Sequence, residues 1–272
     1  YKYEFWSEVI VHQIGKSLGL DVLRYDVAVN GGEIGCISPL MINSDESLIE
    51  VGRYMTAINP DFLPENNAGR KQYTFQLLES TIDHFELSNY WSFLYKTILF
   101  DAIIGNTDRH QENWAFIRNI NDISFVERGL EELEKDIKSN GLQKTPRFLR
   151  WLVSSFVNKE KDELNITGKA IQLSFTKISR IAPIYDSGSS LGRELKDERV
   201  ELLLNDEQAF SKYVHNGLAE IHWEGQKITH FQLVENLLNS AHQEQVMIAS
   251  KFLEDWNDDK IEQIINGIDS SV

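Results

Sequence analysis

The chain has 272 residues, of which 42% are hydrophobic and 25% charged, a balance that excludes wholesale disorder and allows one large domain or two unequal lobes. Acidic residues outnumber basic ones by 42 to 27, and the resulting formal charge of −15 argues against a broad nucleic-acid or anionic-membrane surface, which would need clustered cations. The single cysteine, Cys36, excludes an intrachain disulfide and a four-cysteine zinc site.

Targeting features are absent from the sequence. No segment resembles a signal peptide, and no run approaches the roughly 20 apolar residues of a membrane span. We therefore expect a cytoplasmic protein. The sequence begins at Tyr1 without a Met, which indicates a fragment or a processed chain.

The chain opens with a predicted helix followed by a hairpin. Apolar residues recur at helical spacing over residues 5–18, and Gly19 ends the run as a C-terminal cap would. Two strand-like runs follow, at 21–29 and 34–41. The Asn-Gly-Gly sequence at 30–32 joins them and favours a β-hairpin.

Helical patterns continue toward the middle of the chain. N-cap chemistry at residues 43–46 predicts a short amphipathic helix that reaches about Ile58. A later run, 90–104, is apolar nearly all round, which is typical of a buried helix. It ends at Gly105, directly before a dense polar cluster, and a short strand is expected at 114–117.

The second half of the chain is predicted to be mostly helical. Charged helical segments at 119–177 are interpreted as an insertion in a hairpin whose second strand covers about 174–184. Several amphipathic helices follow over 197–272, with an expected core of Trp223, Phe231, Leu233, Leu237, Phe252, Trp256 and Ile261. The pattern predicts an α+β fold that is mainly α.

The segment 105–114 carries the most informative chemistry. Its sequence places Asp108 and Asn113 five residues apart on a predicted loop, where both side chains can point into one site. Phosphoryl transfer needs such a pair, because a carboxylate orients or deprotonates the attacking hydroxyl and an amide oxygen helps to hold Mg²⁺ against the phosphates. As a bare pattern, however, the pair is more often a polar turn with a helix cap.

A second motif follows the insertion. An apolar strand ends at Asp186, and the small residues Ser-Gly-Ser-Ser come next. This arrangement matches the metal-binding Asp-Phe-Gly of protein kinases, with an acidic residue at a strand end and Gly188 two positions further on. A strand followed by a turn is common by itself, but the two motifs in this order occur together by chance much less often.

The two motifs together closely resemble those of HipA-like serine/threonine kinases: Asn106-Thr-Asp108-Arg-His110-x-x-Asn113 and Ile181-Ala-Pro183-Ile-Tyr185-Asp186. The Asp-Arg-His-x-x-Asn part is shared with phosphatidylinositol kinases, and the Ala-Pro-x-Tyr-Asp part favours the HipA side. The first helix also resembles the helix C of that family. The resemblance implies a protein-kinase-like fold with an incomplete N-lobe at 1–44 and a large helical C-lobe at 45–272.

The resemblance also implies residue roles. Asp108 would be the catalytic base, and Asn113 and Asp186 would bind Mg²⁺. Arg109 would organise the catalytic loop, and His110 would fix it by hydrogen bonding. These five residues form the expected catalytic and metal site.

Nucleotide contacts are implied elsewhere in the chain. Glu8 would pair with the nucleotide-binding lysine, although an exposed helix charge is an equally good interpretation. Leu40 and Met41 would lie in the hinge at 37–42 beneath the adenine of ATP, where the sequence alone predicts a buried strand.

The chain departs from the family pattern upstream of its first helix. The family places a glycine-rich loop and a lysine there, but Tyr1 lies only seven residues before Glu8, and Lys2 is too close to the helix to serve. We interpret this as truncation. Because the phosphates would then lack a cation and several backbone donors, we expect these 272 residues alone to bind ATP weakly and to be weak or inactive as a kinase.

Three classes of function remain open. The leading hypothesis is an ATP- and Mg²⁺-dependent kinase acting on a Ser or Thr hydroxyl of a protein, in the toxin or effector role that the resemblance implies and with a regulatory protein partner left open. A lipid or small-molecule kinase is a second hypothesis, although the acidity and the lack of membrane features count against a lipid. A kinase-fold binding module without catalysis is the third. Neither membrane association nor direct nucleic-acid binding is expected.

Overall fold

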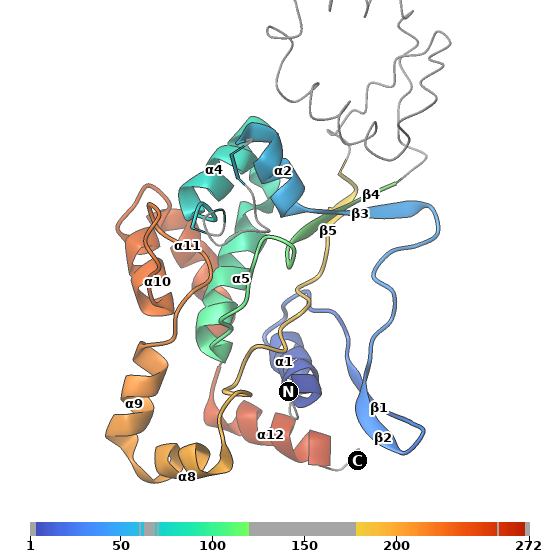
Figure 1. Cartoon of the computed structure of the whole chain (residues 1–272), viewed down its shortest axis with the longest axis vertical. Helices are drawn as coiled ribbons and strands as arrows, with labels where there is room; N and C mark the ends of the chain where they lie inside the picture. The colour runs from blue at the N-terminus through green and yellow to red at the C-terminus, as the bar shows by residue number, and fades with distance from the viewer. Residues whose placement is uncertain are drawn as a thin grey trace, which may run out of the picture.

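Helix α5 (Trp91–Ile104) lies at the centre of a group of helices, whereas a hairpin at residues 26–37 and the helices α8 (Asp197–Asn205) and α12 (Asp258–Asp269) lie beyond its lower end in Figure 1. The computed structural model describes residues 4–59, 61–62, 69, 71–119, 178–254 and 256–269. These residues form mainly helices with two small sheets, so the fold is α+β and mainly α. From residue 120 onward, the predicted insertion lies outside the described residues, as does the first part of the strand predicted at 174–184.

The prediction of a buried helix is confirmed by α5. Its apolar side chains leave no polar face, and Leu94 and Phe100 on different sides of it are both fully buried. Gly105 ends the helix with a φ of 64°, a left-handed conformation that glycine adopts without steric cost. The polar loop, residues 105–114, therefore begins at the C-terminal end of a buried helix.

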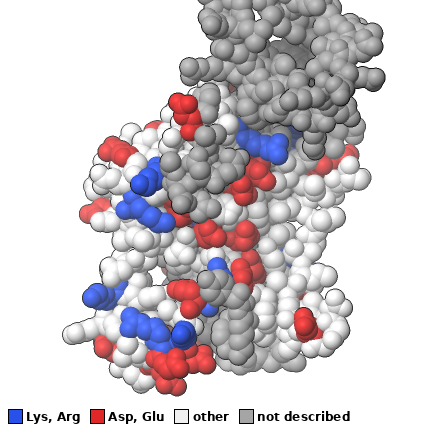
Figure 2. All heavy atoms as spheres, in the orientation of Figure 1, with Lys and Arg blue, Asp and Glu red and all other residues white. Residues whose placement is uncertain are grey.

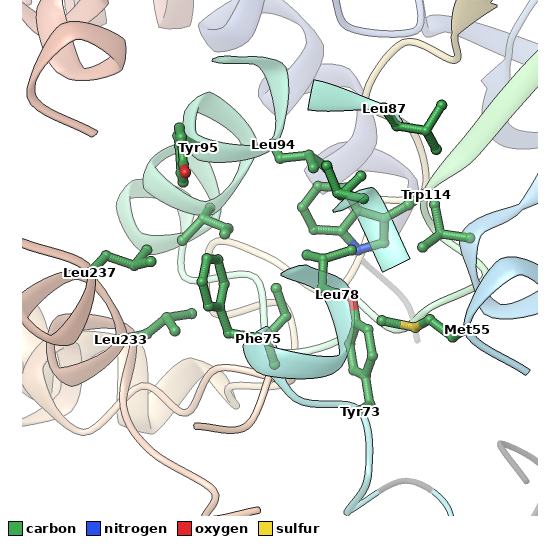
Figure 3. Packing of buried hydrophobic residues seen from close by; sticks show 14 of the residues in the cluster. Met55, Tyr73, Phe75, Leu78, Leu87, Leu94, Tyr95, Trp114, Leu233 and Leu237 are labelled. Carbon is green, nitrogen blue, oxygen red and sulfur yellow. The ribbon is translucent and has the colours of Figure 1, made fainter. Parts of the chain in front are cut away.

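The main core lies where α4 (Phe75–His84), α10 (His230–Leu238) and α11 (Gln243–Ala249) pack around α5. Figure 3 shows Leu233 and Leu237 of α10 facing Phe75 of α4 and the side chains of α5. All three of these residues are at most 2% exposed. Burying an aliphatic or aromatic side chain of this size stabilises a fold by about 1.5–3 kcal/mol.

Helix α1 (Glu4–Ser17) and a hairpin form the N-terminal part of the fold, as predicted. Strands β1 (Asp26–Asn30) and β2 (Glu33–Ile37) are antiparallel, with Asn30 opposite Glu33. The two glycines between the strands have φ values of 61° and 90°, so the turn requires the left-handed backbone that glycine provides. The strands are shorter than the runs that predicted them.

The second sheet corrects one prediction. Residues 46–50, predicted to begin a helix, form strand β3 (Glu46–Glu50), and helix α2 (Val51–Ile58) starts only afterwards. β3 pairs with β4 (Ala115–Asn119), which pairs in turn with the short β5 (Arg180–Ile181), and both pairings are antiparallel. The strand hydrogen bonds to β4, which is distant in sequence, outweigh the local preference for a helix.

A further correction concerns residues 37–42. The segment is irregular beyond β2 and is not a buried strand: Ile37 is 60% exposed and Leu40 is 90% exposed. Met41 and Ile42 pack against a small cluster on the second sheet that includes Ala115. The segment thus connects the two sheets along the surface. The division into lobes at residue 44 falls between these sheets and stays a prediction.

The C-terminal helices are present as predicted, but not all of the expected core residues are buried. Leu233 and Leu237 are, whereas Phe231 is 45% exposed and stacks on His215 with ring centroids 4.6 Å apart. Trp223 is partly buried and stacks on Phe75.

The remaining elements are η1 (Ser88–Tyr90), α8 (Asp197–Asn205), α9 (Glu207–His215), η3 (Ser250–Leu253) and α12 (Asp258–Asp269). Helix α12 packs on α1.

Within the described residues, no helix combines the length and the apolar character that crossing a membrane requires.

Candidate active site

The polar loop is anchored to the end of α5 through Asn106. This side chain is completely buried, and its Nδ2 donates a 3.0 Å hydrogen bond to Oδ1 of Asp101. Its Oδ1 accepts a 3.1 Å hydrogen bond from the backbone N–H of Asp108. Asn106 therefore fixes the backbone between the end of α5 and Asp108.

Arg109 is the centre of the network. Its guanidinium is 2% exposed and forms a bidentate ion pair with Asp101, with Nε–Oδ2 and Nη2–Oδ1 distances of 3.0 Å. Burial alone would lower the pKa of Arg109, but the adjacent Asp101 charge and its hydrogen bonds more than offset this effect and raise it. The arginine therefore stays charged in the interior.

The same guanidinium joins the two sequence motifs. Nη1 donates to the carbonyl oxygen of Tyr185 at 2.6 Å and to that of Asn113 at 3.3 Å, and Nη2 donates to Oγ of Ser187 at 2.9 Å. Two segments that lie far apart in sequence, residues 101–113 and residues 185–187, thus meet at one buried side chain. Arg109 is a positioning residue, since it is enclosed by protein and holds the loop and the segment after β5 together.

Asp108 and Asn113 occupy different environments within this loop. Asp108 is exposed, whereas Asn113 is 5% exposed and donates from Nδ2 to the carbonyl oxygen of Asp108 at 2.8 Å. Because this nitrogen is engaged, the oxygen of the same amide is the atom that could bind a cation. The loop therefore presents one exposed carboxylate and one fixed amide group.

Asp186 has an unusual backbone conformation. Its φ is 51°, in the left-handed region that non-glycine residues seldom adopt, and its side chain is exposed. The conformation is held on both sides: Arg109 binds the preceding carbonyl, and Glu8 binds the two following amides. Such held outliers concentrate at functional sites.

Glu8 of α1 faces this segment directly. It is 9% exposed, and its carboxylate accepts hydrogen bonds from the backbone N–H groups of Ser187 at 3.1 Å and Gly188 at 2.9 Å. Burial raises the pKa of Glu8 to about 7, with the nearby Asp186 charge acting in the same direction and the two amides against it. The interpretation as an exposed helix charge is wrong, and the pairing with a lysine stays a prediction.

Gly188 is required by this contact. A Cβ atom at this position would lie 2.9 Å from Cγ of Glu4 and 3.1 Å from Oε1 of Glu8. A side chain at position 188 would therefore displace the Glu4 and Glu8 side chains and disturb the hydrogen bond from the backbone N–H of residue 188 to Glu8.

The ligand set fits a magnesium–nucleotide complex. Among the described residues, no group of three or more His, Cys, Asp or Glu side chains could enclose a metal ion. The Asn113 amide oxygen and the Asp186 carboxylate are both hard oxygen donors. Mg²⁺ is usually bound by one or two carboxylates together with phosphates and water, so these two residues suit a metal that arrives with ATP.

The remaining predicted residues lie around this centre. His110 is partly buried, and its Nδ1 accepts a 3.3 Å hydrogen bond from the backbone N–H of Glu112, as expected for a residue that shapes the loop. Met41 packs on the sheet that carries β4 and β5, and its carbonyl accepts a 2.7 Å hydrogen bond from Arg180. Leu40 projects into solvent. Nucleotide contacts of Leu40 and Met41 stay predictions.

The sequence predictions did not include the structural role of Asp101. Asp101 left a signal, because it is the single carboxylate in a mainly apolar helix, and a buried charge needs a partner. The nearest cation downstream was Arg109, eight residues further on. Asn106 was identified only as the start of the first motif, and no local pattern indicated that its side chain would be buried.

No protein-family model matches the chain, and no curated protein matches it either. The structure is similar to the crystal structure of the proinflammatory kinase CtkA from Helicobacter pylori, with a TM-score of 0.65 and 17% sequence identity. The match covers 97% of this chain and 73% of the other. At this identity the likeness shows a protein-kinase-like fold.

Proposed function

We propose that the protein is an ATP-dependent kinase that transfers the γ-phosphate to a Ser or Thr hydroxyl of a protein. The observation that carries the proposal is the meeting of the Asp108–Asn113 loop and the Asp186 segment at the buried Arg109. The resemblance of both motifs to HipA-like kinases, and the kinase-like fold, support the same conclusion.

Each residue has a defined task in this proposal. Asp108, exposed at the end of the fixed loop, orients the acceptor hydroxyl and takes its proton. Asn113 and Asp186 would hold Mg²⁺, which would neutralise the charge that develops on the phosphates. Arg109 keeps these groups at fixed separations, since catalysis of phosphoryl transfer depends mostly on positioning and electrostatics.

A groove beside the catalytic loop supports a protein acceptor. It has a volume of about 1080 Å³, begins at Gly105 and Thr107, and continues between residues 191–195 and the helices α8 and α9. Its apolar lining includes Ile103, Leu191, Val200, Leu203, Leu204 and Phe210. This groove could hold the apolar residues of a protein segment whose hydroxyl reaches Asp108.

The charge of the molecule counts against a lipid acceptor. Among the described residues that line the groove, Arg199, Lys212 and Lys227 are cations and Glu194 is the one carboxylate, and Lys227 is paired with Glu220 at 2.9 Å. Figure 2 shows acidic as well as basic side chains over α8 and α9, where the carboxylates include Asp197, Glu198 and Glu207. The net charge of −15 would be repelled by an anionic membrane.

The direct test is transfer of γ-labelled phosphate from Mg²⁺–ATP to a generic protein acceptor. We expect Asp108→Asn to lower the rate by about 10²–10⁴-fold, as removal of a general base does. Asp83→Asn, which changes an exposed carboxylate on α4, should leave the rate unchanged and serves as the matched control. Equal rates for the wild type and Asp108→Asn would contradict the proposal, and so would no transfer by the folded full-length protein, which would favour a binding module.

A further inference from the structure

Three serines follow Asp186, and they differ in their exposure to solvent. Ser187 and Ser190 are at most 2% exposed, and Oγ of Ser187 is already bound by Arg109. Ser189 is partly exposed, and its Oγ lies 3.5 Å from Oδ2 of Asp108. Its hydroxyl therefore occupies the position beside Asp108 where an acceptor hydroxyl has to lie.

The backbone around Ser189 is fixed to the catalytic loop. Its carbonyl accepts a 3.3 Å hydrogen bond from the N–H of Thr107, and the N–H of Leu191 donates to the carbonyl of Ile104 at 2.8 Å. On the other side, Oγ of Ser7 in α1 donates to the carbonyl of Ser190 at 3.2 Å. The proximity of Ser189 to Asp108 is thus built into the fold.

From this geometry we propose that Ser189 is a phosphate acceptor within its own chain. The inference rests on the proposed kinase function. Oγ of Ser189 attacks the γ-phosphorus of ATP and forms the new O–P bond, while the bond between that phosphorus and the β,γ-bridging oxygen breaks. ADP leaves with the electron pair, and Asp108 accepts the hydroxyl proton. Catalytic hydrogen bonds are often long before the nucleotide binds, which agrees with the 3.5 Å separation.

Arg193 is placed to hold the product. Its Nη2 lies 2.7 Å from Oγ of Ser189, and its Nη1 lies 3.3 Å from a carboxylate oxygen of Glu4. A phosphate on Ser189 would gain charge-assisted hydrogen bonds from this guanidinium while it is repelled by Asp108. The phosphorylated side chain fills the acceptor position, so the modification lowers transfer to other proteins.

The first experiment locates the label. The protein is incubated with Mg²⁺ and γ-labelled ATP, with a generic protein acceptor in a parallel sample, and peptides are analysed by tandem mass spectrometry. We expect phosphate on Ser189 at a rate constant that does not depend on protein concentration. Ser189→Ala should lose this label, and Ser80→Ala, an exposed serine on α4, should keep it.

The second experiment measures the consequence. Incubation with Mg²⁺–ATP before the acceptor is added should lower acceptor phosphorylation several-fold in the wild type and leave it unchanged in Ser189→Ala. A labelled acceptor with unlabelled Ser189 would overturn the inference and leave the kinase proposal intact. A Ser189 rate constant that rises with protein concentration would overturn transfer within one chain. A folded full-length protein that labels neither would overturn both proposals.

Discussion

The polar loop at residues 105–114 and the α8–α9 pair depart from the usual distribution of side chains in opposite directions. In the loop, the polar residues Asn106, Arg109 and Asn113 are buried. In the helix pair, apolar residues are exposed, with Leu204 at 79% and Phe210 at 52%, and α9 has no buried residue. Stability alone favours neither arrangement.

The two departures have different physical results. Buried polar groups that bond to one another have a single low-energy arrangement, so the loop gains a defined geometry. Exposed apolar groups gain nothing until another surface covers them, so the helix pair offers area to a partner. A side chain changed in the loop should therefore alter the fold, and one changed on α8 or α9 should alter recognition.

The largest expected effect tests the loop. Arg109→Met would leave Asp101 buried without a countercharge, and we expect the free energy of unfolding to fall by about 3–5 kcal/mol. Urea denaturation measures the change. Arg53→Met, which alters an exposed cation on α2, should change it by less than about 0.5 kcal/mol. A similar loss in both variants would show that the Arg109 network is not special.

A pH-dependent effect is expected at Glu8. Burial raises its pKa from 4.5 to about 7, so the folded protein binds this proton more tightly than the unfolded chain. The stability that it contributes is fully present below pH 4.5 and is lost as the pH rises through about 7. Relative to Glu8→Gln, which does not titrate, the wild type should lose up to about 3 kcal/mol over this window. If the free energies of unfolding of the wild type and Glu8→Gln changed in parallel with pH, the raised pKa of Glu8 would be contradicted.

A smaller effect is expected where α2 touches the loop. Gly52→Ala would place a Cβ atom 2.6 Å from Cγ of Gln111, a buried loop residue, and we expect a loss of about 1–3 kcal/mol from overpacking. Thermal or urea unfolding measures it. Gly267→Ala in α12 is the matched control, because a Cβ there meets no atom within 4 Å. That control should gain up to about 1 kcal/mol from helix propensity. Equal losses in both variants would show that the loss does not come from the contact with Gln111.

The smallest expected effect on stability tests the helix pair. Leu204→Ser removes a side chain that is 79% exposed, so the free energy of unfolding should change by less than about 0.5 kcal/mol. If the groove holds the acceptor, KM for a protein acceptor should rise several-fold while KM for ATP stays constant. Steady-state kinetics with both substrates varied separates the two constants. An unchanged KM for the protein acceptor would show that α8 does not contribute to the acceptor site.

Local patterns in the sequence determined the elements that depend on neighbouring residues. The apolar run before Gly105 predicted the buried α5, and Asn-Gly-Gly predicted the hairpin, because helix burial and turn geometry are set within a few residues. The spacing from Asp108 to Asn113 and the apolar run before Asp186 indicated the two halves of the candidate site for the same reason. The strand predicted to end at Asp186 covers only Arg180–Ile181 within the described residues.

Tertiary structure decided everything that needed a distant partner. Residues 46–50 became a strand because β4 was available to pair with them, and Phe231 stayed exposed because of how α10 faces the core. The joining of the site by Arg109 depends on Asp101, on Asn113 and on residues 185–187, and no local pattern contains all of them. Hydrogen bonds and ion pairs between remote segments form only after the chain has folded, so the sequence supplied the chemical groups and the fold fixed their geometry.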